Sequence, residues 1–199
     1  MTGPNGPPRQ ELLGFASMSM NFSYCGNCGA RTVIRIPEGD HLPRRICDNC
    51  GTIHYENPRI VVGCVAEHEN QILICLRAIE PRRGYWTIPA GFLENGETLE
   101  QGAARECQEE ALATVQIGSL LALVNITGAH QVHVFFRAGL AEPVYGVGIE
   151  SLETKLVHAA DIPWNDIAFP STRFALERYL EDREAGRDSY HSTELNRRL

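Results

Sequence analysis

Apolar residues gather in runs from residue 60 onwards, and these runs predict a β-rich domain. Glu69 and Asn70 form a turn signal between the first two runs, and Cys64 and Cys75 lie within them as small residues that we expect to be buried. A shorter strand is predicted at 154–158, after a loop at 143–148. The longer predicted strands occupy 60–65, 71–77, 115–126 and 131–140.

A helix is predicted between the second and third strands, because Thr98 and Gln101 form a capping box there, and it runs to about residue 111. We expect it to bury one face and to offer three carboxylates from the other. The apolar face consists of Ala103, Ala104, Cys107 and Ala111. At about 100° per residue, three acidic residues fall within a narrow arc beside that face, namely Glu106, Glu109 and Glu110.

A second helix is predicted from about 172 to 184, with Ser171 as its cap and Gly186 beyond its end. Its apolar side consists of Phe174, Leu176, Tyr179 and Leu180. His130 and His133 lie on or beside the strand at 131–140, and without a third ligand at metal spacing we expect them to be structural or to line a pocket.

Carboxylates stacked on one helix face repel one another by some tenths of a kcal/mol per pair, so a cation is needed to balance them. Hard oxygen ligands of this kind suit Mg²⁺ or Mn²⁺. A solvated acidic helix face is the alternative explanation.

Two Cys-x-x-Cys pairs precede the β-rich region, and each is followed by a glycine. Four thiolates at this spacing favour a closed, structural Zn²⁺ site over redox or disulfide chemistry. Basic and acidic residues nearly balance around them, so we expect a scaffold or dimer contact and no nucleic-acid binding. The proposed ligands are Cys25, Cys28, Cys47 and Cys50.

With 199 residues, 43% hydrophobic and 22% charged, the chain is expected to hold one core domain and a smaller one. Its formal charge of -7 argues against affinity based on phosphate neutralisation. No apolar run is long enough to span a membrane, and we expect a cytoplasmic protein whose true start could be Met18 or Met20. The expected parts are a disordered leader (1–21), a zinc ribbon (22–57), a larger β-rich domain (58–185) and a polar tail (186–199).

The stretch from Gly91 to Ala113 resembles the Nudix box, G-x5-E-x7-R-E-U-x-E-E-x-G-U, a signature of hydrolases that cleave nucleoside diphosphates linked to another group. Every charged position of the pattern is present. Leu112 stands where the pattern has Gly, and Cys107 and Ala113 are small at positions that are usually bulky. A residue other than Gly at 112 costs about 1 kcal/mol in a left-handed cap, or shifts the cap.

The resemblance implies an α/β/α sandwich of the Nudix type, preceded by a small zinc ribbon, and a magnesium or manganese site. Glu106, Glu109 and Glu110 would hold the metal together with the carbonyl oxygen of Gly91. Glu97 and Arg105 would form an ion pair between loop and helix, and a later acid would complete the site or act as the base, with Glu150 and Glu153 as candidates. Candidate substrate contacts are Arg77, Arg83, Tyr85 and Trp86.

A ribbon ahead of a Nudix box also occurs in NADH pyrophosphatases, but their S-Q-P-W-P-F-P-x-S element is absent, and the chain reads LVNITGAHQ at 123–131. The segments IPEGD, IHYENP, WTIPAGF and IPWNDIAF are more similar to the FAD diphosphatase group. The resemblance therefore implies hydrolysis of the pyrophosphate bond of a dinucleotide, with FAD converted to FMN and AMP. NADH, NAD⁺ or ADP-ribose hydrolysis, a non-hydrolysing nucleotide sensor and a zinc-ribbon nucleic-acid adaptor are the alternatives, and a homodimer is possible.

Overall fold

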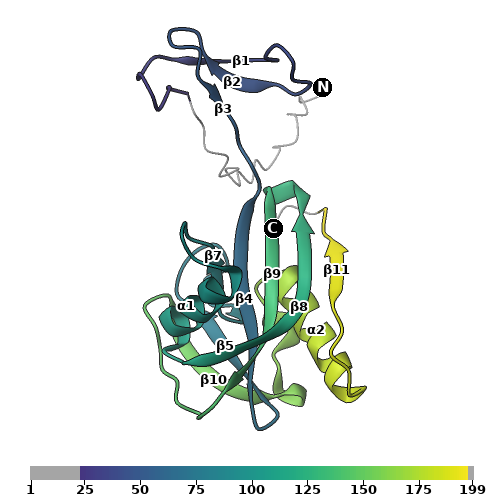
Figure 1. Cartoon of the computed structure of the whole chain (residues 1–199). Coiled ribbons are helices and arrows are strands. Elements are labelled where there is room, and N and C mark those ends of the chain that lie inside the picture. The colour runs from purple at the N-terminus through teal and green to yellow at the C-terminus, as the bar shows by residue number, and fades with distance from the viewer. Residues whose placement is uncertain (1–22, 197–199) are drawn as a thin grey trace, which may run out of the picture. The chain divides into compact units, whose positions relative to one another are not determined.

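A computed structural model describes residues 23–196, and the chain divides into two compact units between Glu56 and Asn57 (Figure 1). The predicted disordered leader, residues 1–21, lies outside the described residues, as do the last three residues of the predicted polar tail. No helix in the described part of the chain is long and apolar enough to cross a bilayer.

The first unit contains a three-stranded antiparallel sheet in the order β1 (Thr32–Arg35), β2 (Arg44–Cys47) and β3 (Ile53–His54). Two tight turns beside this sheet carry the cysteine pairs. Gly29 and Gly51 close the turns with φ near 74° in both, and each donates its N–H to the carbonyl of the first cysteine of its pair, at 2.8 Å. The two turns therefore have matching geometry.

The sulfur atoms of the four cysteines lie within 4.8 Å of one another, as the spacing predicts. Cys25 and Cys50 are 3.6 Å apart and Cys28 and Cys47 are 3.4 Å apart, measured between sulfurs. Contact with Thr52 lowers the pKa of the Cys50 thiol to about 5, which favours the thiolate form that binds metal. Four sulfur donors at these distances fit a tetrahedral zinc ion.

The second unit is built on a mixed sheet in the order β10-β5-β4-β9-β8-β11, in which β4 pairs with β9 and β8 with β11 in parallel. Two short strands pair with it off this path, β6 (Trp86–Thr87) with β5 and β7 (Ala90–Phe92) with β4. The strands of the main path are β4 (Arg59–His68), β5 (Gln71–Arg77), β8 (Val115–Ile126), β9 (Gln131–Leu140), β10 (Ser151–His158) and β11 (His191–Glu194).

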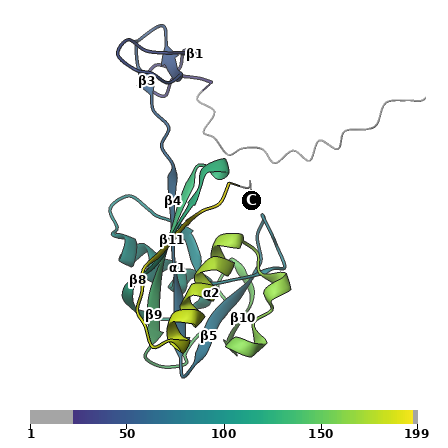
Figure 2. The same cartoon turned by 90° about the vertical axis from the view of Figure 1, so that its right-hand side faces the viewer.

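Helix α1 (Leu99–Ala111) covers one face of this sheet and helix α2 (Pro170–Glu184) covers the other (Figures 1 and 2). Alternate residues of β4 supply the two cores, because successive side chains of a strand point to opposite faces. Cys64 packs in the cluster that includes Cys107 of α1, and Val65 packs in the cluster that includes Leu176 of α2. The predicted α/β/α sandwich is confirmed.

Single-turn 3-10 helices occur at Thr127–Ala129, Ala159–Asp161 and Trp164–Asp166. The predicted capping box is confirmed, since Thr98 Oγ1 accepts the N–H of Gln101 and the Gln101 side chain accepts the N–H of Thr98. The cap at the other end of α1 is in the expected place, with Leu112 in the left-handed region at φ 50°. The helix thus ends as the Nudix pattern requires, despite the missing glycine.

The predicted start of the second helix is wrong. The helix begins at Pro170, whose missing N–H costs nothing at the first helical position, and Phe169 occupies the cap position without a side-chain bond. Ser171 lies inside the first turn, and its hydroxyl contacts His133 instead of capping the helix.

The polar segment after residue 185 contains a strand that the sequence did not predict. Strand β11 pairs in parallel with residues 122–125 of β8. Asp182 at the end of α2 fixes the segment, since its buried carboxylate accepts from His191 Nε2 at 2.9 Å and from the N–H of Ser189 at 3.1 Å, and also pairs with Arg137. The segment is held by charged groups, and this is why a search for apolar runs does not find it.

His133 on β9 is a buried imidazole in the core beside α2, with both ring nitrogens hydrogen-bonded. Burial lowers the pKa of this side chain from 6.5 to about 4, so the ring is neutral in the folded protein at neutral pH. The histidine is structural, or lines a pocket, as the sequence analysis expected.

We expect one zinc ion per chain, because zinc binding and folding of such a ribbon are coupled. Replacing Cys47 with Ser should abolish zinc retention and unfold at least the first unit, whereas Cys75→Ala, which removes a thiol of the second unit, should keep the zinc. Elemental analysis of protein purified without added metal provides the measurement. A folded, metal-free wild-type sample would contradict the assignment.

His133 should weaken the fold in acid. A histidine whose pKa is lowered on folding is protonated first in the unfolded chain, so its stability contribution is intact above pH 6.5 and is lost as the pH falls towards 4. At pH 4 the free energy of unfolding is lower by about 3 kcal/mol for this reason. Urea unfolding across this range should give a flatter pH dependence for His133→Gln than for wild type, and the exposed control His158→Gln should follow wild type.

Candidate active site

Two glutamates of α1 are buried against the short strand β7. The exposed fractions of Glu106 and Glu110 are 8% and 4%, whereas the side chain of Glu109 is 58% exposed. The expectation that all three carboxylates lie on a free face is therefore wrong for two of them. The helix presents Glu106 and Glu110, one turn apart, to the backbone at 90–91, and Glu109 lies at the edge of this site.

Gly91 is the residue that permits this approach. A Cβ atom at position 91 would lie 2.4 Å from the carboxylate of Glu106, closer than any real contact allows. The backbone of Gly91 therefore lies directly against the carboxylate of Glu106. Glu110 contacts the same strand, because its Oε2 accepts the N–H of Ala90 at 3.1 Å.

Arg105 is the cation that holds the loop 92–97 against α1. Its guanidinium binds Glu97 with contacts of 2.7 and 3.0 Å and donates to the carbonyl of Phe92 at 3.0 Å. One further nitrogen, Nη1, bridges Glu106 at 2.7 Å and Glu109 at 3.0 Å. Arg105 thus neutralises the exposed side of the acid cluster and lowers the pKa of Glu97 to about 2.

Glu110 receives less compensation. Its pKa is raised to about 8, chiefly by burial; the charges of Glu106 and Glu150 contribute to this rise, and the Ala90 N–H and the charge of Arg77 oppose it. Burial also raises the pKa of Glu106. Among the described residues, only the four cysteines form a group of three or more His, Cys, Asp or Glu side chains whose ligand atoms all lie within 4.8 Å of one another. The carboxylate oxygens of the three glutamates of α1 are therefore further apart than this.

The loop before β10 is fixed to the C-terminal end of α1. The carbonyl of Glu110 accepts the N–H of Gly148 at 3.1 Å and the hydroxyl of Ser151 at 2.8 Å, and Gly146 donates to the carbonyl of Ala111 at 2.7 Å. A Cβ at Gly148 would lie 1.8 Å from the carbonyl oxygen of Glu109. Only glycine can therefore hold the loop this close to the helix.

This arrangement distinguishes the two late acids. Glu150 follows the anchored segment, and its charge acts on both Glu106 and Glu110. Glu153 is exposed on β10 opposite Leu76 of β5, and its charge is not among the main causes of the pKa shifts of Glu106 and Glu110. The structure brings Glu150 to the cluster and leaves Glu153 on the strand.

Of the predicted substrate contacts, Arg77 lies nearest to the carboxylates. It is 9% exposed, donates Nε–H to the carbonyl of Pro81 at 3.0 Å, and acts electrostatically on Glu110. Arg83 is exposed in the loop before β6. Tyr85 is 36% exposed with Arg82 over its ring, whereas Trp86 is buried in the core with Lys155 4.0 Å from its ring centre.

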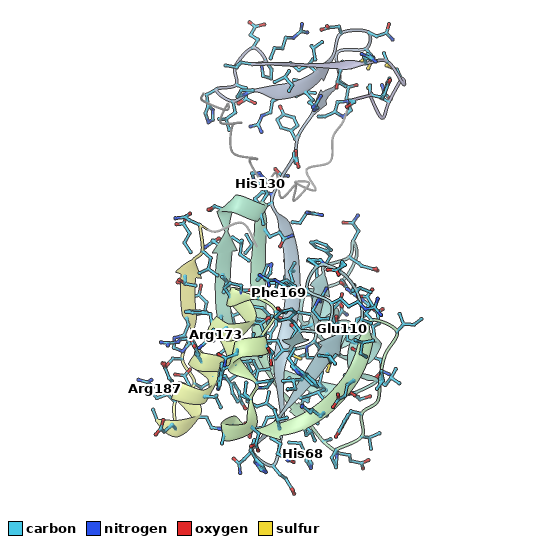
Figure 3. All side chains as sticks on the ribbon, turned by 180° about the vertical axis from the view of Figure 1, so that it is seen from behind. His68, Glu110, His130, Phe169, Arg173 and Arg187 are labelled. Atoms are coloured by element: carbon cyan, nitrogen blue, oxygen red, sulfur yellow. The ribbon has the colours of Figure 1, made fainter. Side chains whose placement is uncertain are left out.

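Phe169 is a site residue that sequence reasoning missed. The Arg77 guanidinium lies 5.0 Å from its ring centre, so the residue before α2 joins the cluster that includes Glu110 (Figure 3). Its only signal in the sequence is its place directly before Pro170, at the start of the helix.

The donor set fits a divalent cation. Glu106 and Glu110 are buried carboxylates with raised pKa values, and the charge of Glu150 adds to theirs. The exposed carboxylate of Glu109 lies at the rim of this group. Oxygen-only ligands of this kind suit Mg²⁺ or Mn²⁺.

Comparison with known proteins agrees with both units. The profile of the Nudix N-terminal zinc ribbon matches residues 23–56, and the profile of the NUDIX domain matches residues 57–172. In structure, the chain is similar to a crystal structure of a NUDIX hydrolase from Nitrosomonas europaea, with a TM-score of 0.85 and 51% identity over 87% of this chain and 99% of that one.

Curated relatives match over shorter spans. A protein named NAD-capped RNA hydrolase NudC from Vibrio parahaemolyticus is 37% identical over 102 residues, which are 50% of this chain and 36% of that protein. A protein named ADP-ribose pyrophosphatase from Methanocaldococcus jannaschii is 36% identical over 71 residues, 36% of this chain and 42% of that protein. The match thus spans less than half the length of either. Because the NUDIX profile extends over more than half of its residues, this chain belongs to the NUDIX family.

Proposed function

We propose that this protein is a metal-dependent hydrolase of the diphosphate bond in dinucleotides that contain adenosine, with FAD as the preferred substrate and FMN and AMP as products. The observation that carries the proposal is the pair of buried carboxylates, Glu106 and Glu110, packed against the backbone at Gly91. Such a pair is costly unless it serves a cation, and a cation beside a diphosphate is suited to hydrolysis.

Each residue of the site has a task in this reaction. Glu106 and Glu110 would hold the metal with the Gly91 carbonyl and Glu109, and the bound metal would supply Lewis-acid polarisation of the phosphate. Glu150, which is exposed and whose charge acts on Glu110, would accept a proton from the attacking water. Arg77, whose charge acts on Glu110, would offer positive charge to the phosphate oxygens. Arg105 keeps the loop and the helix together while these groups act.

The flavin preference rests on what flanks the diphosphate. The S-Q-P-W-P-F-P-x-S element of NADH pyrophosphatases is absent, and the corresponding stretch here is the β8–β9 hairpin with Thr127–Ala129 at its tip. Tyr85 is the exposed aromatic in the loop before the box, while Trp86 is committed to the core. A stacked three-ring flavin would gain on the order of 1 kcal/mol from one such contact, a several-fold preference.

Cleavage of NAD-type or ADP-ribose substrates is the second candidate, because relatives at 36–37% identity carry the names NAD-capped RNA hydrolase and ADP-ribose pyrophosphatase. FAD, NAD⁺ and ADP-ribose share an AMP half and differ in the group beyond the diphosphate. The metal cluster can act on all of them, so only the flanking contacts discriminate between them.

A substrate panel tests this proposal. We expect kcat/KM for FAD to exceed that for NADH, NAD⁺ and ADP-ribose several-fold at one fixed Mg²⁺ concentration, because the flavin offers the largest stacking surface. Tyr85→Leu should reduce the preference for FAD and leave the rate with ADP-ribose little changed. If NADH or ADP-ribose is cleaved tenfold better than FAD, the flavin assignment fails and the general reaction class stands.

The late acids give a second test. Glu150→Gln should lower kcat at least tenfold with little change in thermal stability, since it removes a proton acceptor beside the metal ligands. Glu153→Gln, the same change on the exposed strand, should keep wild-type turnover. Glu110→Gln provides the reference for loss of the metal site and should lower kcat by about a hundredfold or more. Equal rates for the Glu150 and Glu153 variants would rule out the role given to Glu150.

A further inference from the structure

Three polar residues form a hydrogen-bonded chain on the α2 side of the sheet. Ser171 Oγ lies 3.0 Å from Nδ1 of His133, and Nε2 of His133 lies 2.9 Å from Oε1 of Gln131. Ser171 and His133 are 0% and 6% exposed, and Gln131 is half-buried. Two buried residues therefore hold a third that reaches the surface.

The direction of each bond follows from the chemistry of the groups. The side-chain oxygen of Gln131 can only accept, so Nε2 of His133 carries the proton. A neutral imidazole then has an unprotonated Nδ1, which accepts the hydroxyl proton of Ser171. The amide orientation of Gln131 is fixed as a result, and its NH₂ group faces away from His133. Within residues 23–196 this NH₂ group has no hydrogen-bond partner.

The register of the sheet places this amide beside the catalytic strand. His133 is opposite Val61 of β4, and Val61 is opposite Phe92 of β7, which directly follows Gly91. Arg59 is opposite Gln131, and its guanidinium lies 4.7 Å from the ring centre of Phe92. Two strand spacings separate β7 from β9, about 10 Å, and Gln131 lies three residues along β9 from the position in register with Gly91, a further offset of about 10 Å. An extended adenosine attached to a diphosphate at Gly91 spans a distance of this order when the reach of the Gln131 side chain is added.

A second series of interactions connects Ser171 with the acid cluster. Phe169 is two residues before Ser171 in the chain, and Arg77 lies over its ring. Arg77 in turn acts on Glu110. Gln131 thus lies on the α2 face of the sheet and the acid cluster on the α1 face. Strand β7 links the two faces, because Gly91 lies against Glu106 and the next residue, Phe92, which is 44% exposed, points to the other face beside the half-buried Arg59.

We propose that Gln131 is a specificity-determining residue that donates a hydrogen bond from its amide NH₂ to a ring nitrogen of the substrate's adenine. His133 and Ser171 are the positioning residues that keep the NH₂ group turned outwards. Phe92, with Arg59 beside it, provides the aromatic face on which the purine stacks. The assignment rests on the proposed function, in which the adenine half is shared by all candidate substrates and Tyr85 serves the group at the other end.

Gln131→Met tests the assignment, because Met keeps the length of the side chain and removes the donor. We expect KM for FAD and for ADP-ribose to rise about three- to tenfold, the value of one hydrogen bond, with kcat changed less than KM. Gln116→Met on β8, an exposed residue opposite Gly139, is the matched control and should behave as wild type.

Calorimetric binding separates this proposal from the proposed function, since it needs no turnover. AMP should bind Gln131→Met three- to tenfold more weakly than wild type, whereas ribose 5-phosphate, which lacks the base, should bind both proteins equally. Ser171→Ala should move AMP binding in the same direction, because an unrestrained His133 lets the amide turn. Unchanged AMP affinity, or an equal loss for both ligands, would overturn the assignment even if every dinucleotide is cleaved. The AMP result supports it even if FAD is not the substrate.

Discussion

The burial of two like-charged carboxylates against a backbone strand is the constraint on which the catalytic unit depends. Glu106 and Glu110 leave water only because Gly91 has no side chain, the Ala90 N–H is free to donate, and Arg105 balances the outer edge. The first two supports come from the strand β7 and the third from the helix itself. The site therefore depends on how α1 is held against the sheet. The apolar cluster between α1 and the sheet holds the helix in this place.

The two halves of the proposed substrate site depend on different interactions. On the α1 side, close backbone packing at Gly91 and Gly148 brings acids together and raises their pKa values. On the α2 side, a neutral histidine and a serine orient one amide without any charge. Charge is concentrated where phosphate chemistry needs it, and the opposite face offers neutral donors and aromatic surface, which suit a planar base.

The sequence predicted those features whose signals are local. Strand periodicity, the Thr98 capping box, the cysteine pairs and the charged pattern of the box can all be recognised in short stretches of the sequence. The misses concern long-range effects. Pro170 starts α2, and this leaves Ser171 free to bind His133. Strand β11 is held by Asp182, which lies 9 residues before His191 in the chain. It pairs with an edge of β8, which is some seventy residues away in the sequence. The charge of Glu150 acts on Glu110 because Gly148 anchors the preceding loop to α1. No periodicity in the sequence reveals this anchoring.

Strand β11 also covers an edge of the sheet that could otherwise pair with another copy of the chain. It occupies the outer edge of β8 at residues 122–125, where unpaired N–H and C=O groups would otherwise form a template for another chain. The covering strand is short and polar, His-Ser-Thr-Glu, so its own outer edge offers little to a hydrophobic partner. A cut after α2 would leave the catalytic residues in place and expose this edge. The edge that β11 covers and the residues of the proposed metal site thus belong to separate parts of the same sheet, so we expect the loss of β11 to promote association without removing the proposed site.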